Sequence, residues 1–160
     1  MEFIRYGGTP PRGCPSALWD DLCLTGLPKK VITIFKASPE PVLASANLDG
    51  HRTNGIVLGY SREDQELYLD FDSGKVWRLW VEDSGHMIVN RSLQAFRESL
   101  IWVDARYPFH PSDRTLDAAW VAEQAIRQAL VDIDDTATAE PDGFWSAFLD
   151  DVAVGDYAGP

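Results

Sequence analysis

The sequence predicts an α+β protein in which a mainly antiparallel, twisted β-sheet is covered by helices on one face. Short segments that are rich in β-branched residues, or that alternate apolar and polar residues, suit strands and fill the chain up to Val89. Longer segments with apolar residues at helical spacing fill the chain from Leu93 onward. Strands followed by helices, rather than alternating with them, are typical of α+β domains.

Length and composition indicate one globular domain with an acidic surface. We expect residues 1–160 to form a single domain, with an irregular segment at 1–15 and a frayed tail at 155–160, because 160 residues suffice for one core. The formal net charge of −11 opposes binding to nucleic acid or anionic membranes and favours encounter with a basic partner. Such a charge can equally serve only to keep the protein soluble.

The cysteines and the apolar segments bear on the cellular compartment. Cys14 and Cys23 form neither a C-x-x-C pair nor a zinc-ligand pattern with histidine, so we expect two free thiols rather than a disulfide. No apolar stretch reaches the roughly 18–20 residues that span a bilayer. The first eight residues lack the apolar core of a signal peptide. These features predict a cytoplasmic protein.

The N-terminal part is predicted from turn residues and short apolar runs. Ser16 can cap a helix, Gly26 and Pro28 can end it, and prolines are excluded from central strands. We therefore expect, in order, a helix at 17–24, a strand at 31–35, a loop bounded by Pro39 and Pro41, a turn-rich loop at 47–55 and a strand at 56–60. For residues 42–48 a strand and a loop both remain open.

The segment from Leu67 to Leu100 gives the clearest pattern in the chain. Alternating residues separated by D-S-G turns predict strands, and an apolar stripe at helical spacing predicts a helix. In order, we expect strands at 66–71, 76–81 and 87–89, then a helix at 93–106 that is capped by Asn90 or Ser92 and buries Leu93, Phe96, Leu100 and Val103. Further on, we expect a helix at 116–133 and a last helix capped by Asp142, with Phe144, Trp145, Phe148, Leu149 and Val152 on its apolar stripe.

Four pieces of this pattern together resemble a known family. They are Ile56-Val57-Leu58-Gly59, the hairpin LYLDFDSGKVWRL, the strand-to-helix step VNRSLQAFRESL and the tail DGFWSAFLDDV. On these pieces, the chain from about Ile56 to Val152 resembles the SUKH superfamily, and most closely its fourth branch. Residues 1–50 fit the family poorly.

The resemblance implies an architecture and a function. SUKH proteins are α+β proteins best known as immunity proteins of bacterial polymorphic toxin systems, so the resemblance implies that this chain binds and neutralises a cognate toxin. Many such toxins are nucleases or nucleic-acid deaminases, which bind polyanions and tend to be basic, in agreement with the charge of −11. The implied mechanism is occlusion of the toxin's active site or substrate groove. The resemblance implies no enzymatic activity, no catalytic residue and no cofactor.

Residues that could carry chemistry have simpler explanations. Asp70 and Asp72 resemble the start of a calcium loop, but Val81 stands where that loop needs Glu, so we expect a hairpin turn and no metal site. No hydrolase, P-loop, dinucleotide-binding or zinc-protease motif occurs in the sequence. The three histidines lie far apart in predicted loops, where we expect them to be solvated: His51, His86 and His110.

The predicted partner-binding site lies on the central hairpin. Trp77 and Trp80 have opposite parity on one strand, so they point to opposite faces. Trp77 shares parity with two other apolar residues of the strand, which predicts that it faces the core. Trp80 would then share an outer face with Arg78 and Tyr68, and an aromatic centre with an acidic rim suits a basic partner. The predicted contact residues are Tyr68, Asp70, Arg78, Trp80, Glu82 and Asp83.

Other interpretations stay open. The aromatic residues of the hairpin can form a satellite cluster under the proline-rich loop, and the acidic residues can be a charged sheet edge that prevents strand pairing. A SUKH-like fold can also serve as a regulatory scaffold, and a small hydrolase can assemble a site around His51 or His86. The sequence leaves the oligomeric state open. The other four tryptophans lie on predicted helices and are expected in the core: Trp19, Trp102, Trp120 and Trp145.

Overall fold

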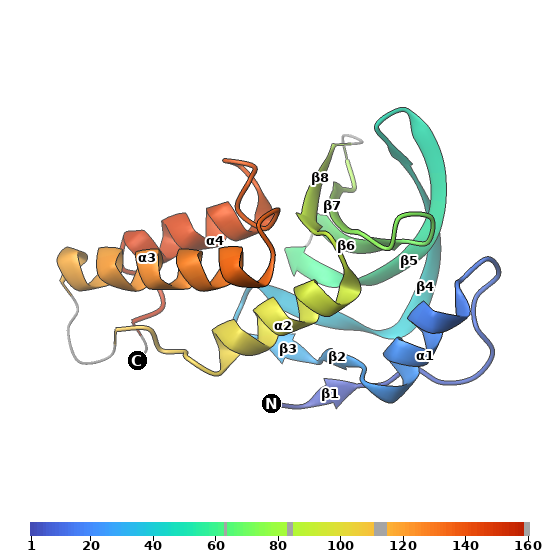
Figure 1. Cartoon of the computed structure of the whole chain (residues 1–160), viewed down its shortest axis with the longest axis horizontal. Coiled ribbons are helices and arrows are strands. Elements are labelled where there is room, and N and C mark those ends of the chain that lie inside the picture. Colours follow the sequence, from blue (N-terminus) through green and yellow to red (C-terminus); the bar gives the residue numbers. More distant parts are fainter. Residues whose placement is uncertain (63, 83–84, 111–114, 159–160) are drawn as a thin grey trace.

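The structure is a computed structural model that describes residues 1–62, 64–82, 85–110 and 115–158, without the side chain of Arg62. Its elements confirm the α+β class, and apart from α1 the strands precede the helices (Figure 1). They are β1 (Phe3–Ile4), α1 (Ser16–Leu24), β2 (Leu27–Pro28), β3 (Lys30–Val31), β4 (Phe35–Leu48), β5 (His51–Arg62), β6 (Gln65–Asp70), β7 (Val76–Trp80), β8 (His86–Asn90), α2 (Leu93–Asp104), α3 (Leu116–Ile133) and α4 (Phe144–Ala153).

The main sheet is a six-stranded antiparallel meander. Its strands lie in the order β3-β4-β5-β6-β7-β8, so each strand pairs with its neighbours in the chain, while β1 and β2 form a separate two-stranded sheet. The sheet is curled: α2, α3 and α4 lie to one side of it, and the β4–β5 hairpin arches away on the other side (Figure 1). Both faces of the central strands are therefore covered.

The long β4–β5 hairpin replaces the turn-rich loop expected at 47–55, and that prediction is wrong. Leu48 pairs with His51, and only Asp49 and Gly50 lie between the two strands. Both turn residues have a positive φ, 52° and 81°, as a two-residue hairpin turn of this kind requires. The Asp-Gly pair was thus a hairpin signal, and the segment 42–48, left open between strand and loop, is strand.

Two further expectations for the N-terminal part are also wrong. The strand expected at 31–35 is interrupted by a tight turn, in which Ile32 has a φ of 47° between β3 and β4. β4 then runs through Pro39 and Pro41, where a loop was expected. The prolines are tolerated because β3 pairs with β4 only up to Lys36, and because the register with β5 slips between Ala37 and Val42.

The helices after the sheet match their predicted bounds closely. Ser92 caps α2, accepting a hydrogen bond from the backbone N of Ala95 at 3.1 Å, and α3 spans the residues expected. The cap of α4 differs: its N-cap is Gly143, without a side-chain cap, rather than Asp142. The predicted apolar faces of α2 and α4 are buried in the core: Leu93, Phe96, Leu100, Val103, Phe144, Trp145, Phe148, Leu149 and Val152.

α3 lies outside the other helices. It packs against α4 and α2 (Figure 1) rather than on the sheet. Trp19 and Trp145 are buried as expected and Trp102 is half-buried, but Trp120 on α3 is 60% exposed, so the expectation of a core position is wrong there. None of the helices in the described part of the chain is long and apolar enough to cross a membrane.

The tail is not frayed as far as it is described. The ring of Tyr157 lies 5.2 Å from that of Phe148 on α4, centroid to centroid, and its hydroxyl is 3.3 Å from Thr33 Oγ1 in the β3–β4 turn. The tail therefore joins α4 to the edge of the sheet.

Candidate partner-binding surfaces

The hairpin of β6 and β7 forms as predicted, but its faces are the reverse of those expected. In the register Tyr68 lies opposite Trp77, and Leu67 lies opposite Arg78. Trp77 therefore shares the face of Tyr68, away from the helices, while Arg78 and Trp80 share the helix-facing side with the core residue Leu67. The expectation that Trp77 faces the helical core, with Tyr68, Arg78 and Trp80 together on the opposite face, is wrong.

The faces are reversed because the apolar residues that share the parity of Trp77, namely Leu79 and Val81, are not core residues. Leu79 is only half-buried, and Val81 follows the end of β7 and is 62% exposed. The true core residue of the strand is Val76, which is fully buried on the face of Arg78. Opposite parity was right, but the sequence did not show which face the helices cover.

Tyr68 is fully buried under the arching β4–β5 hairpin. Its hydroxyl is 3.3 Å from Thr53 Oγ1, and Gly55 lies so close that a Cβ there would be 2.5 Å from Tyr68 Cζ. Burial raises the pKa of Tyr68, and the nearby carboxylates of Asp70 and Asp72 raise it further. Tyr68 thus holds the curl of the sheet, and its side chain is closed to a partner.

Asp70 is buried and shapes the turn between β6 and β7. Its carboxylate accepts hydrogen bonds from the backbone N of Asp72 and of Ser73, both at 3.1 Å, and a short one from Ser73 Oγ. The hairpin-turn interpretation is confirmed. Among the described residues, no group of three or more His, Cys, Asp or Glu could hold a metal ion.

Arg78 links the sheet to the start of α4. Its side chain is buried, donates to the carbonyl oxygen of Asp142 and to Met87 Sδ at 3.6 Å, and lies 4.3 Å from the ring centroid of Trp80. Trp80 is half-buried and Glu82 is exposed, while Asp83 lies outside the described residues. Of the six predicted contact residues, Trp80 and Glu82 therefore form the part that reaches the surface.

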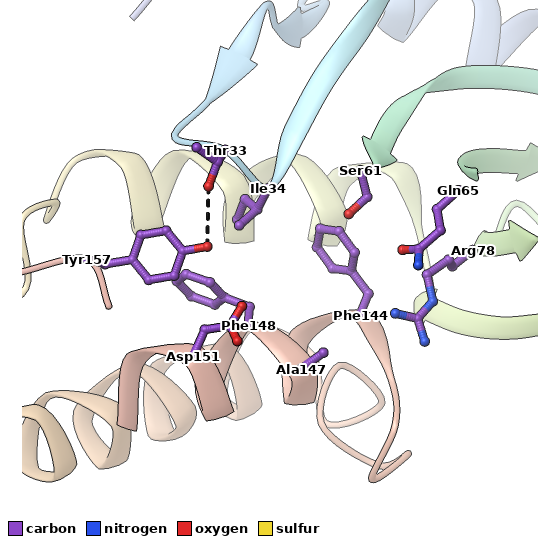
Figure 2. A pocket seen from close by; sticks show the side chains of 10 residues that line it. All are labelled: Thr33, Ile34, Ser61, Gln65, Arg78, Phe144, Ala147, Phe148, Asp151 and Tyr157. Carbon is purple, nitrogen blue, oxygen red and sulfur yellow. Dashed lines mark hydrogen bonds between the residues drawn. The ribbon is translucent and has the colours of Figure 1, made fainter. Parts of the chain in front are cut away.

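A cleft lies between the edge of the sheet and α4 (Figure 2). Its volume is about 290 Å³, and Figure 2 shows Arg78 at one end and Tyr157 with Asp151 at the other, with Phe144 and Phe148 between them. The walls are thus mixed: aromatic rings come from α4 and the tail, polar side chains come from the sheet, and charged groups lie near the two ends. These side chains mostly complete the contact between sheet and α4.

The histidines are less solvated than expected. His51 is exposed but lies on β5, and His110 is buried. His86 is half-buried, and its Nε2 lies 3.0 Å from Asp49 Oδ1 at the tip of the β4–β5 hairpin. This contact joins the hairpin tip to β8. An open hollow of about 280 Å³ lies beside it. Ser45 Oγ, in the described part of its wall, donates to Asn54 Oδ1 and not to His86.

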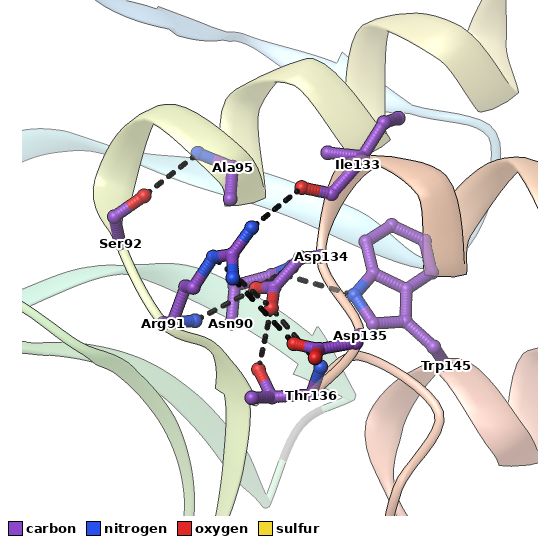
Figure 3. A network of polar contacts seen from close by, with 9 residues as sticks. All are labelled: Asn90, Arg91, Ser92, Ala95, Ile133, Asp134, Asp135, Thr136 and Trp145. Carbon is purple, nitrogen blue, oxygen red and sulfur yellow. Dashed lines mark hydrogen bonds and ion pairs between the residues drawn. The ribbon is translucent and has the colours of Figure 1, made fainter.

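A buried polar network fastens the two C-terminal helices to the sheet (Figure 3). The carboxylate of Asp134, directly after α3, accepts from Asn90 Nδ2 at 2.9 Å and from the backbone N of Arg91 at 2.8 Å. Asn90 Oδ1 in turn accepts from Trp145 Nε1 on α4 at 3.0 Å. One carboxylate therefore ties together the end of β8, the end of α3 and the start of α4.

The network also sets the charge state of Asp134. Burial by itself would raise the pKa of Asp134, but the hydrogen bonds from Arg91, Asn90 and Thr136 outweigh it and hold the pKa below the usual range. The guanidinium of Arg91 adds an ion pair at 3.6 Å. The carboxylate is thus ionised at neutral pH and acts as a fixed acceptor.

The outer end of the two helices carries a surface that the sequence analysis missed. Leu116, Trp120 and Val121 on α3 are 69%, 60% and 62% exposed, and Val154, directly after α4, is 67% exposed. From Thr115 onward the chain has ten acidic residues and one basic residue, so this part carries −9 of the net −11. The uneven distribution of charge along the sequence could have pointed to this part of the chain. The net charge of the whole chain does not show where the acidic residues lie.

The structure is thus a small α+β domain: a curled antiparallel sheet joined by a polar network to a pair of helices in the acidic C-terminal part of the chain. The chain belongs to the SUKH-4 immunity protein family, whose model matches residues 14–151 of the 160. The resemblance drawn from Ile56 to Val152 is confirmed, and the match extends into residues 1–50, which had fitted poorly. No curated protein and no solved structure matches the chain in the same comparisons. Membership indicates an immunity function against a toxin.

Proposed function

We propose that this protein binds one cognate toxin of a bacterial polymorphic toxin system and neutralises it in the cytoplasm by occlusion. The observation that carries the proposal is the family match, which spans most of the chain, including the sheet and the helices that follow it. The protein acts as a binding partner and not as an enzyme. In support, the described hydroxyl in the wall of the hollow beside the histidine–carboxylate pair, Ser45 Oγ, is bonded to Asn54 and not to His86.

The toxin that suits the charge of this protein is basic. The chain carries −11 overall, and −9 of it lies from Thr115 onward, so its field attracts positively charged surfaces and repels nucleic acid. A nuclease or nucleic-acid deaminase must hold a polyanion, and the groove that holds it is positively charged. An acidic protein that covers such a groove excludes the substrate by charge and by volume.

Only part of the predicted hairpin site is retained in this proposal. Tyr68, Asp70 and Arg78 are buried, so they can shape a contact surface but offer little of their own area to a partner. Among the predicted contact residues that the structure describes, Trp80 and Glu82 remain accessible to a toxin. Their role in binding the toxin stays a prediction. The exposed apolar residues at the outer end of α3 and α4 are the alternative contact surface.

The experiment is co-expression of this protein with the toxin domain encoded beside its gene, in a bacterial host that the toxin alone kills. We expect growth to be restored, a one-to-one complex to be purified, and its affinity to fall as salt rises, because screening weakens attraction between opposite charges. An unrelated acidic protein of similar size is the control. Growth that stays blocked with the toxin and this protein both present, and no complex on mixing, would sink the proposal.

A further inference from the structure

The outer end of the helical pair gathers exposed apolar side chains that the fold does not use. Leu116 and Trp120 are four residues apart on α3, so they are neighbours on one side of the helix. α3 and α4 run antiparallel (Figure 1), so α4, whose C-cap is Val154, runs toward the end of the pair at which α3 begins. We name these residues the helical-end patch: Leu116, Trp120, Val121 and Val154.

The patch has the composition of a binding surface. A tryptophan that is 60% exposed and flanked by exposed aliphatic residues marks a candidate contact surface, because contact between apolar side chains and water is unfavourable in free energy. Tryptophan is among the residues that contribute most to binding in protein interfaces. α3 already packs against α4 and α2 with Ala119, Ile126 and Leu130, so the patch is not needed for that contact.

The rim of the patch defines the charge of its partner. Asp117 adjoins Leu116, and Asp150 and Asp156 flank the end of α4; all three are exposed. Arg127, the one basic residue from Thr115 onward, is paired with Glu123 at 2.7 Å. A second copy of this chain would bring acidic residues against acidic residues here, whereas a basic protein would find opposite charges around an apolar centre.

We infer that the helical-end patch is the surface on which the toxin docks, with Trp120 as its central contact and the aspartates facing lysines or arginines of the toxin. This inference rests on the proposed function and assigns its site. The hairpin end is the weaker candidate, because Trp80 is half-buried and its ring is covered by the guanidinium of Arg78 at 4.3 Å.

The structure offers a closely matched pair of variants to separate the two surfaces. Val121 in the patch and Val81 beside Trp80 and Glu82 are both 62% exposed. Val121→Lys and Val81→Lys therefore remove the same exposed apolar area and add the same charge, one at each surface. We expect Val121→Lys to weaken binding of the toxin domain at least about tenfold and Val81→Lys to change it less than about threefold, measured by calorimetry with purified proteins.

A second pair and a footprint make the result independent of one position. Leu116→Lys is matched by Leu24→Lys on α1, since these leucines are 69% and 76% exposed, and only the first is expected to weaken binding. Hydrogen exchange of the wild-type complex should show protection by the toxin at residues 116–125. Circular dichroism and urea unfolding of each variant check that the fold is retained.

The outcomes separate this inference from the function on which it rests. If Val81→Lys weakens binding more than Val121→Lys, or if protection falls on 79–82 and not on α3, the docking surface is the hairpin end and the inference is overturned while immunity stands. A concentration-dependent dimer that Val121→Lys abolishes, with toxin binding unchanged, would assign the patch to a second copy and also overturn it. Failure of the wild-type protein to bind or protect would instead overturn the proposed function.

Discussion

The sheet and the helical pair of this molecule differ in what holds them and in what they expose. Residues 1–114 carry 13 basic and 15 acidic residues, a net −2, and bury a continuous apolar core between the curled sheet and α2. The chain from Thr115 onward, which contains α3 and α4, carries −9 of the net charge, and it joins that core mainly through the apolar stripe of α4, with Ile126 and Leu130 from α3. α3 buries one side, with Ala119, Ile126 and Leu130, while Leu116, Trp120 and Val121 are exposed.

The position of an aromatic side chain in the layers of the fold, and not its residue type, decides whether it packs in the core or is exposed at the surface. Trp145 on α4 is fully buried and donates from Nε1 to Asn90, while Trp120 on α3 is 60% exposed. Both lie in the same helical pair, and both satisfied the same sequence criterion. Substitution of each tryptophan can therefore test whether the two side chains contribute differently to stability.

The largest expected effect is on that tryptophan pair. Trp145→Ala removes a fully buried ring and leaves Asn90 Oδ1 without its donor, so we expect a loss of about 4 kcal/mol in the free energy of unfolding. Trp120→Ala should change it by less than about 0.5 kcal/mol, because its ring is mostly in water. Urea unfolding of both variants measures the difference. Similar losses would mean that α3 is as much part of the core as α4.

The same comparison shows what sequence could predict. The bounds of α3 and the buried stripe of α4 followed from helical spacing, because a periodic apolar stripe of that length is a local property. Periodicity also marked α3 as a helix without showing that it packs against α4 and α2 rather than on the sheet. The exposure of Trp120 is decided by that arrangement of layers, which no local pattern contains.

The sheet shows the same limit at the candidate site. Strand parity correctly separated Trp77 from Trp80, but a curled sheet has two covered faces, and the curl depends on contacts between distant residues. Gly55 permits it by letting the ring of Tyr68 approach the backbone of β5. The burial of Tyr68 and Arg78 therefore could not be predicted, although both lie on a hairpin whose strands and turn were.

The second prediction concerns the network that joins the two regions. Asp134→Asn keeps the shape of the side chain but replaces one of its two acceptor oxygens by an NH₂ group, so either Asn90 and Arg91 or Thr136 lose their acceptor, and we expect a loss of about 2 kcal/mol at pH 7. The matched control is Asp135→Asn, since Asp135 is exposed and adjacent, and it should change stability by less than about 0.5 kcal/mol.

This contribution has a defined dependence on pH. The folded state holds the pKa of Asp134 below that of an ordinary aspartate, so the unfolded state binds the proton first. The stabilisation is complete above the ordinary aspartate pKa of about 4 and is lost as pH falls below it through the folded value. The difference between wild type and Asp134→Asn in urea unfolding should therefore shrink from pH 6 to pH 3. A difference that grows on acidification would contradict the lowered pKa.

The smallest expected effect tests whether the β4–β5 arch is held by a polar contact or by packing alone. Tyr68→Phe keeps the buried ring and removes the hydroxyl that lies 3.3 Å from Thr53 Oγ1, so we expect a loss of about 1 kcal/mol. Tyr60→Phe on β5, where the ring is 36% exposed, is the control and should be close to neutral. Hydrogen exchange should also quicken at 46–53 in Tyr68→Phe, because this contact joins the arch to β6. Because the arch lies away from the helical-end patch, toxin affinity should stay unchanged, and a loss of affinity would mean that the partner reaches the sheet as well as the helices.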